Sequence, residues 1–320
     1  MSQTRKGIMA LSLLGSILSC DWADEARADS LRAEVLKCSF LPYEPVAIHV
    51  DLCFDEPVLV DFAEDPEEAE KQFRRIPRRL NVKLRDEQGT EVSESLLFGA
   101  EFTRPERGHP AKEFSACGLA FFEVLKMAKG KAWELDPGHY TIVVSGAGRL
   151  QSGAIAVELV APEGKELEAA EAFRANFPGG ALIILAQEDQ TGAMSSFEDL
   201  ARDYPETIYG KYAIVSLALM RFQDTVAEHS DKGGAVVWEP VARELAAAEK
   251  LFTGKHPLRE KVLFRLAQVR VVCGDYAGAR KYLAAVKKDF PRGEFGSRSE
   301  QFEERISQRE KQERSNGEQP

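Results

Sequence analysis

The spacing of apolar residues changes once along the chain, from every second position to every third or fourth. In residues 31–162, runs such as Ala47 to Leu52 and Leu80 to Leu84 alternate apolar and polar positions, which is typical of half-buried strands. Turn sequences containing Gly or Pro, such as Asp86 to Gly89 and Asp136 to Gly138, separate these runs. The pattern predicts an all-β domain over residues 31–162.

From residue 163 onward the period is helical. Leu245, Ala248, Leu251 and Phe252 recur at intervals of three, three and one, and comparable stripes precede and follow them, as expected for amphipathic helices packed on one side. We therefore expect an all-α domain over residues 163–296. The last residues, 297–320, are almost entirely polar and charged, which predicts a charged and disordered tail.

One β-like segment carries a resemblance to a known architecture. Leu135 to Val144 reads as a turn, then Pro-Gly-x-Tyr, then a strand. This order is similar to the start of a late strand in many bacterial surface sandwiches, in which the tyrosine, here Tyr140, packs at a corner. Together with the recurring strands, it predicts an immunoglobulin-like β-sandwich.

The clearest helical unit runs from Glu260 to Arg292. Its pattern consists of apolar and small residues on two helices, a Gly-Asp-Tyr turn between them and a closing proline; the residues are Leu263, Ala267, Gly274, Tyr276, Ala279, Leu283 and Pro291. The unit resembles the tetratricopeptide repeat. Asp203-Tyr204-Pro205 has the same order of acid, aromatic residue and proline as Asp289-Phe290-Pro291. Further, degraded copies of the repeat are therefore expected.

This resemblance implies antiparallel helical pairs that stack and leave a groove for an extended or helical peptide. Tyr204 and Tyr209 are candidate partner-binding residues in such a groove, because aromatic side chains dominate interface energies. Most aromatic residues of helical repeats fill space between helices, so core packing is the competing interpretation.

The N-terminus predicts export. Arg5 and Lys6 precede an apolar run from Ile8 to Leu18, which is too short to span a bilayer and is typical of a signal peptide, residues 1–19. The tetrapeptide Ile17-Leu18-Ser19-Cys20 resembles the bacterial lipobox. The resemblance implies that Cys20 is diacylated and becomes the mature N-terminus, followed by a linker over residues 20–30.

Two features of this region leave alternatives open. Ala26-Arg27-Ala28 offers a second cleavage site that would release a soluble protein without a lipid anchor. Asp21, directly after the cysteine, resembles a retention signal for the inner membrane, which favours the inner over the outer membrane without deciding between them.

The charge balance narrows the choice of partner. The chain of 320 residues has a net charge of −10, and residues 29–163 contribute −8 of it, from 16 basic and 24 acidic side chains. Phosphate backbones and anionic headgroups repel such a surface, so protein partners are favoured over nucleic acid. A nucleotide site is not expected either, because Gly146 and Gly148 lack the third glycine and precede another strand-like run.

The residues that carry chemistry are scattered. No metal-binding or redox spacing of His or Cys occurs, and no Gly-x-Ser-x-Gly elbow is present. The acidic and basic segment 61–79 favours a solvated helix or loop over calcium binding. Cys38, Cys53 and Cys117 allow at most one disulfide between them, and their state stays open. We expect no cofactor, no metal and no catalytic residue.

These observations predict an exported, lipid-anchored, non-enzymatic scaffold that mediates protein–protein interactions in the periplasmic cell envelope. The alternative is an exported hydrolase, or an accessory or inhibitor of one, with a site on the sandwich loops near His109 and His139.

Overall fold

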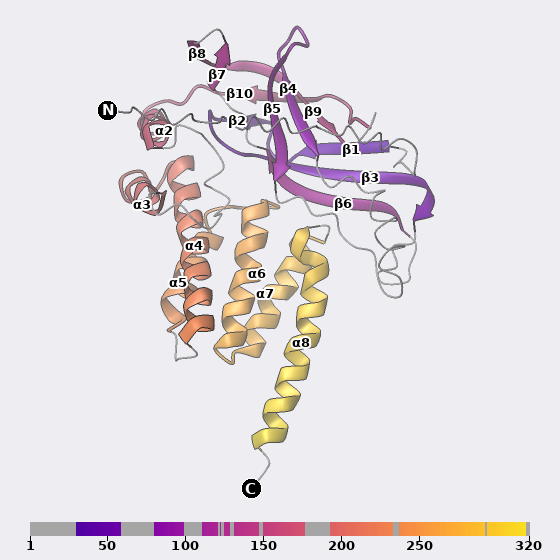
Figure 1. The fold of residues 1–320 in the computed structure, drawn as a ribbon, viewed down its shortest axis with the longest axis vertical. Helices are drawn as coiled ribbons and strands as arrows, with labels where there is room; N and C mark the ends of the chain where they lie inside the picture. Colours follow the sequence, from indigo (N-terminus) through magenta and orange to yellow (C-terminus); the bar gives the residue numbers. More distant parts are fainter. Residues whose placement is uncertain are drawn as a thin grey trace, which may run out of the picture.

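The structure, a computed structural model, has a curled β-sheet at one end and a group of helices that run away from it (Figure 1). It describes residues 30–58, 80–98, 111–120, 122, 125–128, 131–146, 150–176, 193–232, 237–291 and 293–317. The expected signal peptide, the lipobox and the charged segment 61–79 lie outside these residues. Strands precede helices along the chain, in the order that the change of period predicts.

The strands of the described residues are β1 (Ser30–Val35), β2 (Ser39–Phe40), β3 (Val46–Val58), β4 (Asn81–Arg85), β5 (Glu91–Phe98), β6 (Ala111–Ala120), β7 (Leu125–Ala128), β8 (Lys131–Glu134), β9 (Gly138–Ser145) and β10 (Ile155–Leu159). Eight of them form one sheet in the order β1-β3-β6-β5-β4-β9-β10-β2, and β7 and β8 form a separate hairpin. Neighbours in the large sheet are antiparallel, except that β2 runs parallel to β10.

The prediction of an immunoglobulin-like β-sandwich is wrong. β5 pairs with β4 over Glu91 to Leu96 and with β6 through Leu97 and Phe98, so it joins the two halves into one sheet. The sheet curls until β1 and β10 come into contact, which gives an open half-barrel. Period-two alternation reports only that one face of each strand is buried. It does not distinguish two facing sheets from one sheet folded onto itself.

The concave face of this sheet encloses its own hydrophobic core. Ile48, Val50 and Leu52 of β3 point inward and are completely buried, and they belong to one cluster with Val82 of β4 and Ile142 of β9. Curling brings these side chains together, because strands far apart in the sheet order then share one interior.

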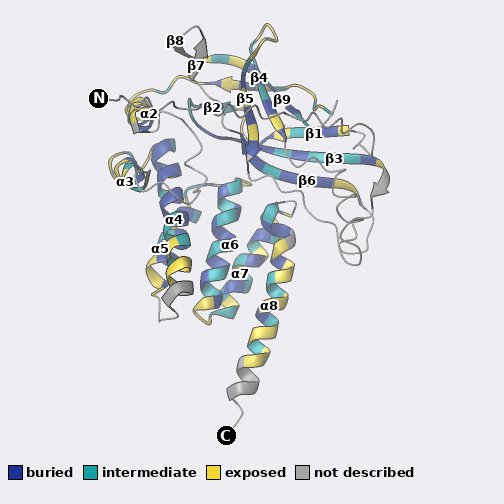
Figure 2. Ribbon diagram, viewed as in Figure 1, coloured by how far each residue is buried: buried dark blue, intermediate teal, exposed yellow. Residues whose placement is uncertain are grey.

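The helices of the described residues are α2 (Lys165–Asn176), α3 (Ala193–Asp203), α4 (Ile208–Lys232), α5 (Glu239–Glu249), α6 (Pro257–Val272), α7 (Tyr276–Asp289) and α8 (Glu294–Gly317). Neighbours along the chain pack against each other from α2 to α8. Figure 2 shows that α4 is largely buried near the sheet, whereas α8 becomes more exposed away from it.

The residues of the predicted repeat unit lie on α6, α7 and the turns beside them. The apolar members of the motif, Leu263, Ala267, Ala279 and Leu283, are buried in one cluster. Gly274 has a φ of +75°, which favours glycine, and the adjacent Asp275 caps α7 by accepting a hydrogen bond from the Gly278 N–H at 2.8 Å. Tyr276 begins α7 and Pro291 follows its end.

The sheet and the helices share a second hydrophobic core. Ala47 of β3 and Leu119 of β6 lie on the convex face of the sheet and join the cluster formed by α2 to α6. The buried Tyr209 of α4 donates its hydroxyl proton to the Pro42 carbonyl oxygen at 2.6 Å. Because both faces of β3 and β6 are covered, these central strands hold the two parts of the chain together.

Side chains cap the helix N-termini near the sheet. A carboxylate oxygen of Glu166 accepts a hydrogen bond from the Ile208 N–H of α4 at 2.9 Å. His256 accepts one from the Leu258 N–H of α6 through Nδ1 at 3.2 Å. The Nδ1 acceptor fixes the tautomer with a proton on Nε2, which lies 3.1 Å from the Tyr212 hydroxyl. Burial lowers the pKa of His256 to about 4, so the ring stays neutral.

Glu260 caps α8 from the neighbouring helix α6. Its Oε1 accepts a hydrogen bond from the Phe295 N–H at 2.7 Å, and only 2% of the residue is exposed. A Cβ atom at Gly293 would clash with the same oxygen, so glycine at this position allows the close approach of the Glu260 carboxylate. Burial raises the pKa of Glu260 to about 7, against the opposing effect of its backbone hydrogen bonds.

The Tyr209 hydrogen bond predicts a measurable contribution to stability. Tyr209→Phe removes the hydroxyl and leaves the Pro42 carbonyl without this donor, so we expect the free energy of unfolding to fall by about 1 kcal/mol. Urea denaturation followed by circular dichroism measures the change. Tyr282→Phe is the matched control, because no hydrogen bond of the half-buried Tyr282 hydroxyl is recorded in the described part of the chain. Equal losses in the two variants would contradict the assignment.

The Glu260 cap predicts a pH dependence with a definite sign. Its pKa is higher in the folded than in the unfolded protein, so the folded state binds the proton more tightly and stability falls as the pH rises between about 4.5 and 7. Glu260→Gln keeps a carbonyl acceptor but does not titrate. Both proteins are denatured at pH 5 and at pH 8. From the lower to the higher pH, the free energy of unfolding of the wild type should fall by on the order of 3 kcal/mol more than that of the variant. A pH-independent difference would refute this account of the cap.

Candidate functional site

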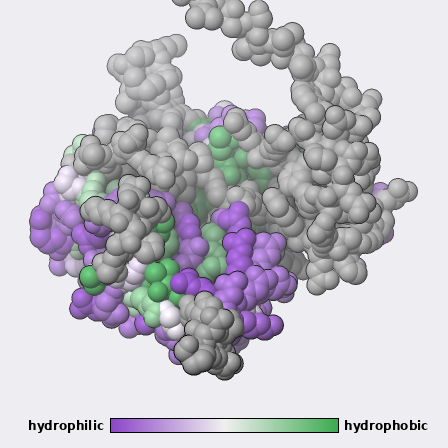
Figure 3. Space-filling view, turned by 60° about the horizontal axis from the view of Figure 1, so that its bottom comes forward, coloured by the Kyte–Doolittle hydropathy of each residue, from purple (hydrophilic) through white to green (hydrophobic). Residues whose placement is uncertain are grey.

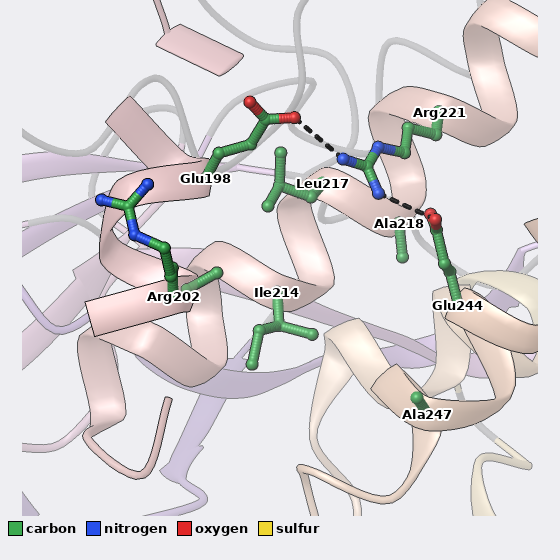
Figure 4. Close-up of a pocket in the computed structure, with 9 residues that line it drawn as sticks. Glu198, Arg202, Ile214, Leu217, Ala218, Arg221, Glu244 and Ala247 are labelled. Atoms are coloured by element: carbon green, nitrogen blue, oxygen red, sulfur yellow. Dashed lines mark hydrogen bonds and ion pairs between the residues drawn. The ribbon is translucent and has the colours of Figure 1, made fainter. Parts of the chain in front are cut away.

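A groove crosses the helices α3, α4 and α5 on the side of α4 that faces both of its neighbours. Its volume is about 460 Å³, and its lining combines small apolar, larger apolar and charged side chains from all three helices: Glu198, Ala201, Arg202, Ile214, Leu217, Ala218, Arg221, Glu244 and Ala247. Alanines at three of these positions leave room for a ligand between the helices. Figure 4 shows Ile214 and Leu217 between the charged residues.

Ion pairs fix one side of the groove. The guanidinium group of Arg221 donates to Glu244 of α5 at 2.8 Å and to Glu198 of α3 at 2.9 Å, so one side chain of α4 links both neighbouring helices (Figure 4). On the other side, Arg202 binds its own helix neighbours Asp199 and Asp203 at 2.8 and 2.7 Å. All of these groups are substantially exposed, so the pairs contribute little to stability.

The arrangement suits the binding of a protein segment. An apolar side chain can cover Ile214 and Leu217, and the amide groups of an extended backbone can reach the carboxylates of Glu198 and Glu244. The lining carboxylates, Glu198 and Glu244, are both ion-paired with Arg221.

The two tyrosines predicted as groove residues lie elsewhere. Tyr209 is 3% exposed, and its ring lies 5.8 Å from Phe173 within the core between sheet and helices. Tyr204 is partly buried against the same core, and its carbonyl oxygen accepts a hydrogen bond from the Thr207 hydroxyl at 2.7 Å. Neither lines the groove on α3, α4 and α5.

The sequence did contain a signal for the groove. Ile214, Leu217, Ala218 and Arg221 follow the three- and four-residue spacing of one helix face. The pairing of Arg221 with residues 23 positions away in both directions depends on how the helices pack, and no local pattern reports it.

The loop proposed for a hydrolytic site contains a second hollow, of about 410 Å³, between two turns of the sheet. The exposed His139 lies there with Asp86 and Asp136, but within the described ranges no hydrogen bond joins this histidine to a carboxylate. The Tyr140 hydroxyl donates to the Asp136 carbonyl at 2.5 Å, and burial raises its pKa. His109 lies outside the described residues. The hollow therefore shows no oriented acid–base pair.

A polar row on the convex face of β3 and β6 contains a histidine, an aspartate and a serine. His49 Nε2 lies 3.1 Å from Asp51 Oδ1, and the Ser115 hydroxyl donates to that same oxygen at 2.5 Å. The carboxylate is in the middle, so the histidine is not placed to take the serine proton, as a hydrolase triad requires. Sequence reasoning did not single out this row.

The four cysteines of the described residues form no disulfide with one another. Cys117 lies opposite His49 in the register of β3 and β6, but burial, and secondarily the charge of Glu260, raise its pKa to about 12, so the thiol stays protonated. Cys38, Cys53, Cys117 and Cys273 are all free thiols.

The described part of the chain holds neither a metal-binding cluster nor a helix suited to crossing a bilayer. No three His, Cys, Asp or Glu side chains of that part lie close enough together to hold a metal ion. None of its helices combines the length and the apolar character needed to cross a bilayer.

The surface at the far end of the helices is predominantly hydrophilic. Figure 3 shows this end with the described apolar side chains in small patches between hydrophilic ones. A ligand that contacts one of these apolar patches therefore also meets the hydrophilic groups around it.

Comparisons with known proteins do not identify the chain. No protein-family model matches it, and no curated protein matches it. One solved structure with some similarity is titled a polysaccharide lyase. It is 9% identical, with a TM-score of 0.18, over 87% of this chain and 47% of the lyase chain. This chain thus spans about half the length of that protein, and a TM-score this low establishes no common fold.

Proposed function

We propose that this chain is an exported, lipid-anchored protein of the bacterial cell envelope that binds other proteins without catalysing a reaction. The observation that carries the binding role is the groove on α3, α4 and α5, with its apolar floor and its rim of ion pairs. The N-terminal sequence supports export and anchoring through Cys20. The resemblance of residues 260–292 to a tetratricopeptide repeat supports a role in protein binding.

Binding in the groove would be non-covalent and local. A partner contributes an apolar side chain that removes the partly exposed Ile214 from water, and its polar groups share the hydrogen-bonding capacity of Arg221 and its two glutamates. Because the exposed ion pairs are weak, they can rearrange around a ligand at little energetic cost. The helices themselves stay fixed by the shared core beneath the sheet.

A charge placed on the groove floor should abolish partner binding. Ile214→Glu puts a carboxylate where the partner's apolar side chain would be buried. We therefore expect the amount of a specific partner recovered with the chain to fall at least tenfold. The measurement is crosslinking of intact cells expressing the tagged full-length chain, followed by quantitative mass spectrometry of the proteins recovered.

The matched control is Val272→Glu, which makes the same kind of change at an exposed valine on α6, outside the groove. Both variants are first checked for wild-type circular dichroism. If Ile214→Glu and Val272→Glu recover the same proteins in the same amounts, the groove is not the binding site.

The lipid anchor has a direct test. Cells that express the wild-type chain should incorporate a labelled acyl-chain precursor into it, and Cys20→Ser should remove the label, because the acyl transfer needs the thiol of Cys20. Fractionation of the same cells should move the variant out of the membrane pellet. A wild-type chain that takes up no label would exclude lipidation and favour cleavage after Ala28.

A further inference from the structure

Three basic side chains gather on α6 and α8, and none of them lines the groove on α3, α4 and α5. Lys261 and Arg265 are one turn apart on α6, and Arg298 lies in the second turn of α8. Glu294 acts on Lys261 and Arg265 and is ion-paired with Arg298 at 2.9 Å. The four residues therefore carry three positive charges and one negative charge.

The guanidinium group of Arg265 is held between two aromatic rings. Its Cζ lies 5.1 Å from the ring centroid of Phe222 on α4 and 5.9 Å from that of Phe295 on α8. One N–H donates to Gln268 at 2.7 Å. For its other N–H groups, no acceptor is recorded within the described residues. The two rings attract the cation, and the remaining N–H groups can donate two hydrogen bonds to one carboxylate.

Lys261 adds an ammonium group without a partner. The side chain is half-buried, and within the part of the chain that the structure describes it makes no ion pair or hydrogen bond. Burial, and after it the charge of Arg265, lower its pKa, and burial also lowers the pKa of Arg265. Both cations are thus held in an environment that disfavours positive charge, and a bound anion would relieve this cost.

We propose that Lys261, Arg265 and Arg298 form a binding site for an acidic peptide segment of a partner protein. Arg265 would bind one carboxylate through two hydrogen bonds, and Lys261 would bind the same or the next carboxylate. The site goes beyond the groove proposal, since it uses other residues and a different recognition chemistry.

The charge of the whole chain favours a short acidic peptide over a polyanion. The protein has a net charge of −10, so a nucleic acid or an anionic membrane that extends past the cluster meets repulsion from the rest of the surface. A peptide with a few carboxylates can engage the local excess of positive charge and end before it reaches the acidic regions.

The test uses the full-length chain and a fluorescein-labelled peptide of four Ala-Glu repeats with blocked ends, measured by fluorescence anisotropy at 50 mM salt. We expect at least tenfold tighter binding than to the same peptide with Gln in place of Glu, and weaker binding at 300 mM salt because the charges are screened. Equal affinity for the two peptides would overturn the proposal.

The variants locate the site. Lys261→Met and Arg265→Met should each weaken binding about tenfold, as expected for the loss of a charge-assisted hydrogen bond, and Arg265→Lys should recover only part of the loss because lysine lacks the planar fork. The control is Arg243→Met, at an exposed position on α5 for which no partner is recorded in the described ranges.

Lys261→Met is the decisive variant, because the lysine makes no recorded contact whose loss would unfold the protein. Unchanged affinity in this variant, or the same loss in Arg243→Met, would place the peptide elsewhere. Tighter binding to phosphatidylglycerol vesicles or to duplex DNA than to the Glu peptide would also refute an acidic peptide as the ligand.

Discussion

The structure depends on burying the N-terminal ends of helices without leaving their backbone N–H groups unpaired. The backbone N–H groups in the first turns of α4, α6 and α8 have no hydrogen-bond acceptor within their own helix. Three side chains accept hydrogen bonds from these N–H groups: Glu166 for α4, His256 for α6 and Glu260 for α8. Two of these caps come from other helices, so the caps also fix how the helices lie relative to one another.

This constraint accounts for the burial of two titratable groups, His256 and Glu260. Burial lowers the pKa of His256 and raises that of Glu260, changes that in many proteins mark a catalytic group. Here each group accepts a backbone hydrogen bond at the start of a helix. The buried carboxyl and imidazole groups therefore have a structural role as helix caps.

The sequence predicted elements better than their arrangement. The alternation around Ile48 and Val50 indicated a strand correctly, and Gly274 with Asp275 marked the turn between two helices. The sandwich was wrong because β5 pairs with both β4 and β6, and no local period reports which strands pair. Glu260 reads as an ordinary acid in a first helical turn. Its burial follows only from the contact with Phe295, 35 residues later.

The two proposed binding surfaces arise from consecutive residues of α4. Arg221 points into the groove between Glu198 and Glu244, and Phe222, one position later, supports Arg265 of α6. Successive helical positions are rotated by about 100° about the helix axis. The helix α4 therefore contributes side chains to both proposed surfaces. The sequence offered Tyr204 and Tyr209 as candidate groove residues or as core residues. Both pack against the core between sheet and helices, which depends on long-range neighbours that no local pattern reports.

The central claim is that the sheet and the helices are one cooperative unit, joined by the shared core around Tyr209 and the capped helix ends. Differential scanning calorimetry of the full-length chain tests it most directly. The account predicts a single transition whose calorimetric enthalpy equals the van't Hoff enthalpy. Two separate transitions, one for the strands and one for the helices, would contradict it.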